Sequence, residues 1–330
     1  MLDPRLLLLA GTLGLFSACQ KDKPNPIAPP APTPLVFHNP IVKDKFTADP
    51  SAMVFNGTVY IYTGHDEAPY PQDVYVMKEW LCFSSTDMVT WTQHPVPLRV
   101  TDFAWARADA WASQVVERGG KFYWYVAVDH GTIPGKAIGV AVSDSPTGPF
   151  RDARGSALVT NNMTTAVNSF FDDIDPTVYV DASGQAYLYW GNSACYWAKL
   201  KPNMIELDGP IQTVPLPQYT EAPWLNKHGD WYYLSYASEF PEKIAYAMSR
   251  SPEGPWEYKG ILNDYPLNSS TNHQALIDFK GKSYFIYHNG AISPNGGSFR
   301  RSVCIDYLSY NADGTLQKVQ MTSKGVDTAQ

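Results

Sequence analysis

The segment FTADPSAMVFNGTVYIYTG, residues 46–64, combines a short apolar run, a Gly turn and an alternating aromatic run. This pattern is typical of a β-hairpin. It returns four more times, and in every copy a Gly is followed three residues later by a Tyr. The pairs are Gly57/Tyr60, Gly120/Tyr123, Gly184/Tyr187, Gly229/Tyr232 and Gly281/Tyr284. The chain is therefore predicted to contain five equivalent hairpins.

Most copies continue with a further apolar run that closes on a turn of Pro, Gly or Asp, as in residues 137–150, 243–256 and 302–315. Each repeat thus has room for four strands, and the repeat spacing suits the blades of a propeller. No sustained helical period follows the N-terminal segment. The sequence predicts an all-β, five-bladed β-propeller. A β-sandwich is the alternative, but it explains five equivalent hairpins poorly.

One position of the repeat is occupied mostly by residues that can act in catalysis. Counting back eight residues from each Gly, or nine in the third copy, reaches the following residues: Asp49, Ala112, Asp175, Glu221 and His273. The first strand of each propeller blade lines the central axis, so we expect these positions to meet at one end of the channel. Three carboxyl groups and a histidine would then form one site.

The N-terminal part of the chain reads as an export signal. Residues 6–18 are apolar but too short for a stable membrane span, and Cys19 follows them directly. This arrangement resembles a bacterial lipoprotein signal, which predicts cleavage after residue 18, lipidation of Cys19 and a membrane-anchored protein of the cell surface or periplasm. The Pro-rich residues 20–35 are predicted to form an extended tether. Residues 1–19 are thus the signal segment, and residues 36–330 are the propeller domain.

Composition limits the partners and the redox chemistry. A net charge of −7 and a pI near 5.5 argue against nucleic-acid binding, which relies on a basic surface. Besides Cys19 the chain has Cys82, Cys195 and Cys304, each in an apolar stretch. An odd number does not make a disulfide framework, so we expect buried free thiols. No motif for a zinc site is present.

Paired carboxyl groups across a cleft can cleave a glycosidic bond. One protonates the departing oxygen, and in the inverting reaction the other activates water on the opposite face of the sugar. A third acid raises the pKa of the proton donor by repulsion between like charges. Asp-Pro alone, as at Asp49 and Asp175, is more often a turn signal. The register that both share with Glu221 favours a catalytic site instead.

The segments FTADPSAMVFNGTVYIYTG, DIDPTVYVDASGQAYLYWG, TEAPWLNKHGDWYYLSYAS and FRRSVCIDYLSYNADGT resemble glycoside hydrolase family 43. The resemblance runs from about residue 39 to residue 319. It implies a five-bladed propeller that hydrolyses arabinose- or xylose-containing glycans with inversion and without a cofactor. It also implies Asp49 as general base, Asp175 as modulator of the acid and Glu221 as general acid. Ala222 stands where Gly is frequent in the family.

The same resemblance implies two further residues. His273 would face the channel and help to hold a structural calcium ion, often through water. From spacing alone a hydrogen-bonded buried histidine is the simpler interpretation, because calcium prefers oxygen ligands. Arg301 would contact sugar hydroxyls, since a guanidinium can engage two oxygens. Its neighbour Arg300 would then point to the other side of the strand.

Aromatic side chains near the expected mouth are candidate platforms for sugar rings: Phe46, Trp105 and Trp111. Long connections at residues 65–80, 101–111 and 160–174 are expected to wall a pocket, which suits removal of one terminal sugar at a time. We therefore predict an exo-acting α-L-arabinofuranosidase for arabinoxylan or arabinan. A β-D-xylosidase acting on xylo-oligosaccharides, an endo-arabinanase and a non-catalytic glycan-binding surface lipoprotein are the alternatives.

Overall fold

The computed structural model describes residues 38–330. The predicted signal segment, Cys19 and the Pro-rich tether lie outside these residues and stay predictions. In the described part the regular elements are β-strands, and the single helical element there is the 3-10 turn η1 (Val100–Asp102). No helix within residues 38–330 is long and apolar enough to cross a membrane.

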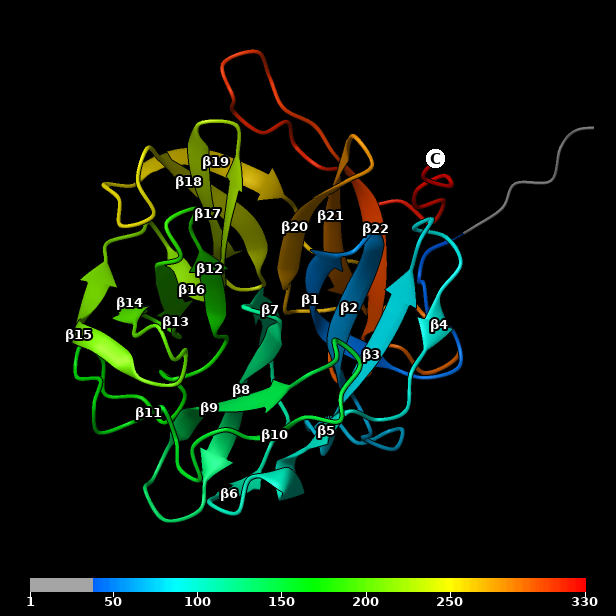
Figure 1. The fold of residues 1–330 in the computed structure, drawn as a ribbon. Coiled ribbons are helices and arrows are strands. Elements are labelled where there is room, and N and C mark those ends of the chain that lie inside the picture. The colour runs from blue at the N-terminus through cyan, green and yellow to red at the C-terminus, as the bar shows by residue number, and fades with distance from the viewer. Residues whose placement is uncertain (1–37) are drawn as a thin grey trace, which may run out of the picture. The chain divides into compact units, whose positions relative to one another are not determined.

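Five antiparallel sheets follow one another along the chain (Figure 1). The first contains β1 (Thr47–Phe55), β2 (Thr58–His65), β3 (Glu79–Ser85), β4 (Thr92–Gln93) and β5 (Leu98–Arg99). The second contains β6 (Ala106–Ala108), β7 (Ser113–Arg118), β8 (Lys121–His130), β9 (Lys136–Ser143), β10 (Arg151–Asp152) and β11 (Val159–Thr160). The third contains β12 (Thr177–Val180), β13 (Ala186–Trp190), β14 (Cys195–Leu200) and β15 (Leu207–Val214). The fourth contains β16 (Tyr219–His228), β17 (Trp231–Ser238), β18 (Lys243–Ser249) and β19 (Glu257–Asn263), and the fifth contains β20 (Gln274–Phe279), β21 (Lys282–Asn289) and β22 (Ser302–Leu308).

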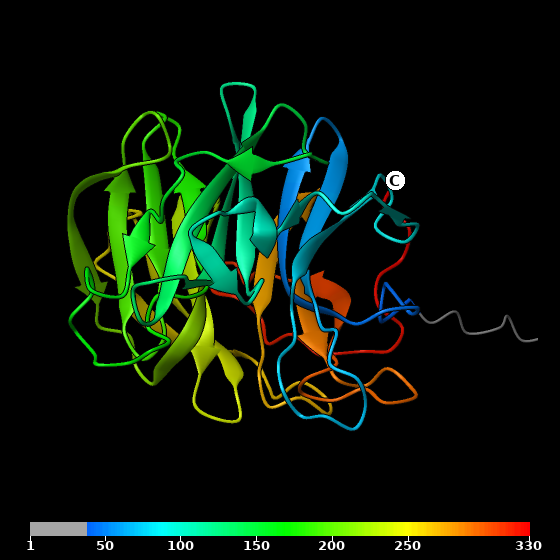
Figure 2. The same cartoon turned by 90° about the horizontal axis from the view of Figure 1, so that it is seen from below.

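The sheets are the blades of a propeller, as predicted. Strand β1 contacts both β7 and β20, β12 contacts β7 and β16, and β16 contacts β20. These five strands therefore close a ring, around which the outer strands of each blade radiate (Figures 1 and 2). The third and fourth sheets have the expected four strands, whereas short additional strands extend the first two sheets and the described fifth sheet has three.

The repeated glycine forms the turn between the first two strands of each blade. In the first blade Phe55 pairs with Thr58, so Asn56 and Gly57 make a two-residue loop, and both have a positive φ, of 48° and 72°. Such a loop matches the twist of the two strands that it joins. The repeat glycines of the other four blades also have positive φ. The turn of the third blade is longer, because Val180 pairs with Ala186. This explains the extra residue in that copy.

The core lies between neighbouring blades and consists largely of the aromatic residues of the repeat. Tyr62 of β2, for example, packs edge to face against Trp124 of β8, with ring centroids 4.9 Å apart. Such pairs lock one blade against the next through apolar burial and aromatic geometry. The three cysteines of the described chain are free and buried, as expected: Cys82, Cys195 and Cys304.

The two ends of the described chain meet on the fifth blade. The backbone N–H of Ile41 donates to the carbonyl of Val303, and that of Thr47 donates to the carbonyl of Arg301. The side chain of Asn39 binds the backbone of Ile305 through both its amide nitrogen and its oxygen. Residues 38–47 therefore run along β22 and join the first blade to the last.

Candidate active site

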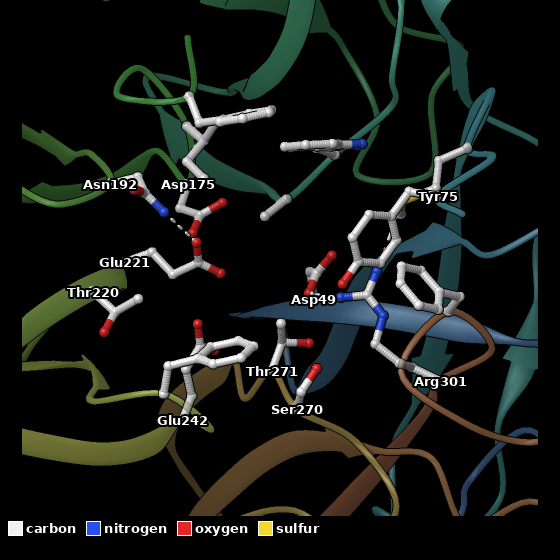
Figure 3. Close-up of a pocket in the computed structure, with 17 residues that line it drawn as sticks. Asp49, Tyr75, Asp175, Asn192, Thr220, Glu221, Glu242, Ser270, Thr271 and Arg301 are labelled. Carbon is white, nitrogen blue, oxygen red and sulfur yellow. Dashed lines mark hydrogen bonds and ion pairs between the residues drawn. The ribbon is translucent and has the colours of Figure 1, made fainter. Parts of the chain in front are cut away.

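Three carboxyl groups of the repeat meet in one cavity of about 390 Å³. Asp49 lies in β1, Asp175 lies two residues before β12, and Glu221 lies in β16. Figure 3 shows Asp175 and Glu221 side by side, with Asp49 across the cavity from them. Ala112, the equivalent residue of the second blade, also lines the cavity. Repeat positions far apart in sequence thus meet at one place, while the chemical role of each residue stays a proposal.

The backbone at these positions departs from regular strand geometry. The register of β1 against β2 shifts between Ala48 and Ser51, and that of β16 against β17 shifts on both sides of Glu221. Such bulges re-aim a side chain away from the usual alternation of a strand. Asp49 and Asp175 also have positive φ, of 49° and 57°, a conformation that costs roughly 1–3 kcal/mol in a residue other than glycine. The fold holds both carboxyl groups in place at this cost.

Asp49 is held by a buried arginine. Nη1 of Arg301 lies 2.7 Å from Oδ1 of Asp49, while its Nε and Nη2 lie 2.9 and 3.0 Å from the two oxygens of Asp66. Both Asp66 and Arg301 are almost fully buried. Arg301 lines the cavity, but all three of its nitrogens have carboxylate partners. The arginine therefore fixes the position of Asp49. Its predicted contact with sugar hydroxyls stays a prediction.

The adjacent arginine has a different environment. Arg300 binds the carbonyl of Gln72 and the carboxylate of Asp73, and its guanidinium lies over the ring of Tyr70. It is absent from the lining of the cavity. The two arginines thus point to opposite sides of the chain, and Arg300 anchors the loop between β2 and β3.

Two histidines lie behind Asp49. The Asp49 backbone N–H donates to Nδ1 of His288, 3.2 Å away, and Nε2 of His288 lies 2.9 Å from the carbonyl of Thr271. The ring thus accepts at one nitrogen and donates at the other, as a neutral imidazole does. Burial lowers the pKa of His288 well below its usual value, and the charge of Arg301 acts in the same direction.

His273, the fifth repeat position, is buried beside Asp49 rather than in the lining of the cavity. Its Nδ1 is 4.0 Å from Oδ1 of Asp49, and burial lowers its pKa to about 4. That oxygen already accepts from Arg301, and in residues 38–330 no three His, Cys, Asp or Glu side chains converge as metal ligands. Direct coordination of calcium by side chains does not fit this site. Calcium held through water stays a prediction.

Asp175 is linked to the residue that follows Glu221. Its Oδ2 accepts from the backbone N–H of Ala222 at 2.9 Å. Ala222 has a φ of 54°, in the region that favours glycine. Burial raises the pKa of Asp175 well above its usual range, and the charges of Glu221 and Asp49 raise it further. A single carboxyl group thereby fixes the backbone of the residue after Glu221.

Glu221 projects towards the cavity, and a polar side chain of the third blade contacts it. Nδ2 of Asn192 lies 2.6 Å from its Oε2 (Figure 3). Burial raises the pKa of Glu221 to about 7. The charge of Asp49 also raises it, while Asn192 and Arg301 act in the opposite direction. A carboxyl group with this pKa can hold a proton near neutral pH and release it during a reaction.

Acids outnumber cations at this site. Among the residues of the 38–330 segment that line the cavity, Arg301 is the single Lys or Arg. The carboxyl groups that line it or contact this arginine are Asp49, Asp66, Asp175, Glu221 and Glu242. Because like charges at short range disfavour simultaneous ionisation, part of this set carries protons at neutral pH.

Aromatic residues form the walls of the cavity. They are Tyr75, Trp111, Phe171, Phe240 and Phe299. The rings of Trp111 and Phe171 stack at 5.9 Å with an interplanar angle of 10°. Tyr75, Trp111 and Phe171 come from the three long connections expected to wall a pocket. Phe240 and Phe299 are contributed by the fourth and fifth blades.

Two of the three predicted platform residues lie elsewhere. The indole nitrogen of Trp105 donates to Asp152 at 2.9 Å, and its ring packs against Phe103. Phe46 is half-buried, and neither Trp105 nor Phe46 lines the cavity. Distance along the chain from a blade start does not fix where a loop residue points, so Trp111 alone of the three reaches the site.

Several residues at the site were missed by the repeat argument: Asp66, Asn192, Glu242 and His288. All four lie within or shortly after the second strand of a blade, namely β2, β13, β17 and β21. The end of this strand lies beside the start of the first strand, because the two are antiparallel. Polar residues directly after each aromatic run were therefore the signal that could have found them.

An acid-rich, aromatic-walled cavity at the axis of a five-bladed propeller is the arrangement that a glycoside hydrolase requires. The chain belongs to family 43 of the glycosyl hydrolases, because the family model matches residues 37–316. This match confirms the resemblance seen in the sequence. Enzymes of this family invert the anomeric centre and require no cofactor for the chemical step.

Similar proteins act on arabinose- and xylose-containing substrates. The chain is 32% identical to an arabinoxylan arabinofuranohydrolase from Bacillus subtilis, over 87% of this chain and 65% of that protein. An α-L-arabinofuranosidase from Clostridium thermocellum is 36% identical, with a TM-score of 0.72 and 87% and 97% of the two chains covered. A β-xylosidase/α-arabinofuranosidase from a compost metagenome, solved with xylotriose in a calcium-free form, is 29% identical, with a TM-score of 0.77 and coverage of 85% and 96%.

Proposed function

We propose that this protein is an exo-acting α-L-arabinofuranosidase that removes arabinose from arabinoxylan or arabinan by inversion. The observation that carries this proposal is the cavity that has Asp49 facing Glu221 and aromatic side chains on its walls. Its volume of about 390 Å³ falls in the range of small-ligand pockets. A pocket of this kind suits one terminal sugar better than the middle of a polymer.

The proposed chemistry follows from the two sides of the cavity. Glu221 transfers its proton to the glycosidic oxygen as the bond from this oxygen to the anomeric carbon breaks. Asp49 accepts a proton from the water that attacks the opposite face of that carbon. One water is consumed. Glu221 loses one proton to the leaving group, Asp49 gains one from the water, and the configuration of the anomeric carbon inverts.

The surrounding residues support these two roles. Arg301 and the backbone contact with His288 hold Asp49, and Asn192 holds Glu221. Burial and the charge of Asp49 favour the protonated form of Glu221, and Asp175 holds the backbone N–H of Ala222 beside it. A general acid of this kind contributes about 10²–10⁴-fold to the rate.

A β-D-xylosidase is the second candidate. The metagenomic relative carries both activities in its name, and the cavity contains no described feature that separates the two pentoses. An endo-arabinanase requires a cleft open at both ends. The relatives give no support to a non-catalytic glycan-binding lipoprotein, since each of them is a hydrolase.

The location of the enzyme is also a proposal. Residues 6–18 and Cys19 support export and lipid attachment, and residues 20–35 would separate the propeller from the membrane. An anchored enzyme of this kind would act on polysaccharide fragments at the bacterial surface or in the periplasm. Globomycin-sensitive processing of the precursor, or its loss in Cys19→Ser, tests this part of the proposal.

The test of the activity uses purified protein with p-nitrophenyl α-L-arabinofuranoside and β-D-xylopyranoside, beside arabinoxylan and linear arabinan. We expect faster release from the arabinofuranoside, and loss of at least about 10²-fold in Asp49→Ala and Glu221→Ala. NMR of the first product formed identifies inversion. A preference for the xyloside would select the second candidate. An inert wild type would reject the exo-hydrolase function.

A further inference from the structure

The cavity contains a fourth acid that the proposed reaction does not yet use. Glu242 lies directly before β18, is 1% exposed and lines the cavity. Figure 3 shows it on the side of Glu221 opposite to Asn192. Glu221 is therefore flanked by two polar side chains, one from the third blade and one from the fourth.

Glu242 is held rigidly by the backbone around it. Its Oε2 accepts from the N–H of Asn272 at 2.7 Å, and its own N–H donates to the carbonyl of Ser270 at 2.9 Å. Its neighbour Lys243 pairs with Glu239 instead, at 2.7 Å. Glu242 forms no ion pair with any residue of the described chain. A carboxyl group so deeply buried without a cation is more stable with its proton than without it.

Glu242 and Glu221 both line the cavity, where Figure 3 shows them beside each other, and an interaction with Glu242 lowers the pKa of Glu221. Two carboxylates in this contact repel each other, so at least one proton must lie between them. Burial raises the pKa of Glu242 well above its usual value, and the charge of Glu221 raises it further. Glu242 is buried without a cation and its Oε2 already accepts from Asn272, so we take Glu242 as the partner that keeps its proton and donates, and Glu221 as the one that accepts.

We propose that Glu242 is a positioning residue that stays protonated, donates a hydrogen bond to Glu221 and stabilises the carboxylate that Glu221 becomes after protonating the leaving group. The inference rests on the proposed function. In the step itself the proton of Glu221 moves to the glycosidic oxygen, and Glu242 keeps its own proton. Asn192 and Glu242 then face the new negative charge with one donor each, in a site prepared for it before the reaction.

The inference predicts an effect that depends on the leaving group. 2,4-Dinitrophenolate leaves from its glycoside without being protonated. Phenol and the alcohols of natural oligosaccharides must receive a proton from the general acid as they leave. Replacing Glu242 by Leu removes the donor, so kcat on phenyl glycosides should fall by about 10²-fold while kcat on dinitrophenyl glycosides changes little. Glu242→Gln retains an N–H donor and a carbonyl acceptor, and should restore most of the activity.

The pH profile gives a second readout. Removal of a neutral donor leaves the carboxylate of Glu221 less stable, so the alkaline limb of kcat/KM should move to higher pH in Glu242→Leu. If Glu242 were ionised, its removal would move this limb to lower pH and Glu242→Gln would not restore activity. Either result would overturn the inference.

The experiment uses the glycone that the wild type prefers, with circular dichroism and thermal unfolding of each variant. Glu239→Gln, an acid of the same loop that pairs with Lys243, is the matched control and should keep wild-type kinetics. Equal losses on both leaving groups, or a rise in KM alone, would show that Glu242 contacts the sugar and would contradict the inference. A wild type that hydrolyses no glycoside would reject the proposed function itself, which is a separate outcome.

Discussion

Arg301 donates to Oδ1 of Asp49 across 2.7 Å, although 252 positions separate the two residues in the chain. The remaining donors of this guanidinium face Asp66. A planar fork that serves two carboxylates at once cannot be replaced by the point charge of a lysine. The position of the proposed base therefore depends on the geometry of this arginine as well as on its charge.

We expect Arg301→Lys to lower kcat/KM by about 10²-fold, because one ammonium cannot hold Asp49 and Asp66 together and a small displacement at the reacting centre is costly. Steady-state kinetics on the aryl glycosides measure this loss. The control is Arg250→Lys, which changes an exposed arginine that lies over Trp231. Wild-type kinetics in Arg301→Lys would show that charge alone is sufficient.

The alkaline side of the pH profile should report Glu221. Its pKa of about 7 means that the fraction of protonated acid falls as the pH rises through this value. We therefore expect kcat/KM to decline with an apparent pKa near 7. In Asn192→Ala the decline should move to higher pH, because the hydrogen bond from Asn192 favours the ionised form. An alkaline limb that is unchanged in this variant would argue against Glu221 as the titrating group.

The same group should make stability depend on pH. A carboxyl group whose pKa is raised by folding binds its proton more tightly in the folded state, so the free energy of unfolding falls as pH rises from about 4.5 to about 7. Glu221→Gln has no carboxyl group at this position that ionises, so it does not lose this part of the free energy of unfolding as the pH rises. We expect it to unfold at the same temperature as the wild type near pH 4, and several degrees above it at pH 8.

Calorimetry of both proteins across this range measures the difference, and Glu257→Gln, which changes a largely exposed acid, is the control. A difference between Glu221→Gln and the wild type that stays constant with pH would contradict the prediction.

Phe240 should matter for polymers more than for small substrates. It lines the cavity but is 71% exposed, so it lies where a chain leaving the pocket would pass. We expect Phe240→Ala to lower kcat/KM on arabinoxylan by about three- to tenfold, as the loss of one aromatic contact predicts, with little effect on p-nitrophenyl glycosides. Tyr258→Ala, which removes an exposed aromatic residue of β19, should affect neither. Equal losses on both kinds of substrate would place Phe240 against the terminal sugar instead.

The sequence predicted the blades and the repeat positions because both depend on local rules. Alternating apolar residues define the hairpins, and the turn at Asn56 and Gly57 requires positive φ. Once the fold is a propeller, its symmetry brings Asp49, Asp175 and Glu221 to one end of the axis. No contact had to be known in advance for this part of the site.

The remaining features depend on contacts that no local rule specifies. Glu242 and Asp66 lie after the aromatic strands, where the length and path of each loop decide which side chain reaches the cavity. The prediction that Trp105 contacts the sugar was wrong for the same reason, since its indole nitrogen donates to Asp152 and the ring does not line the cavity. The bulges at Asp49 and Glu221 also leave no mark in the alternation of apolar residues.

The joining of the first and last blades also has a consequence for synthesis of the protein. The first strand and the segment before it are made early on the ribosome, but their partners Arg301, Val303 and Ile305 are made only with the fifth blade. Early blades can form their own hairpins while translation continues, but the ring cannot close around Asp49 until β22 has left the exit tunnel. A nascent chain that stalls before this strand would present finished blades, while Asp49 would lack the arginine that holds it and the inner strand of the first blade would stay exposed.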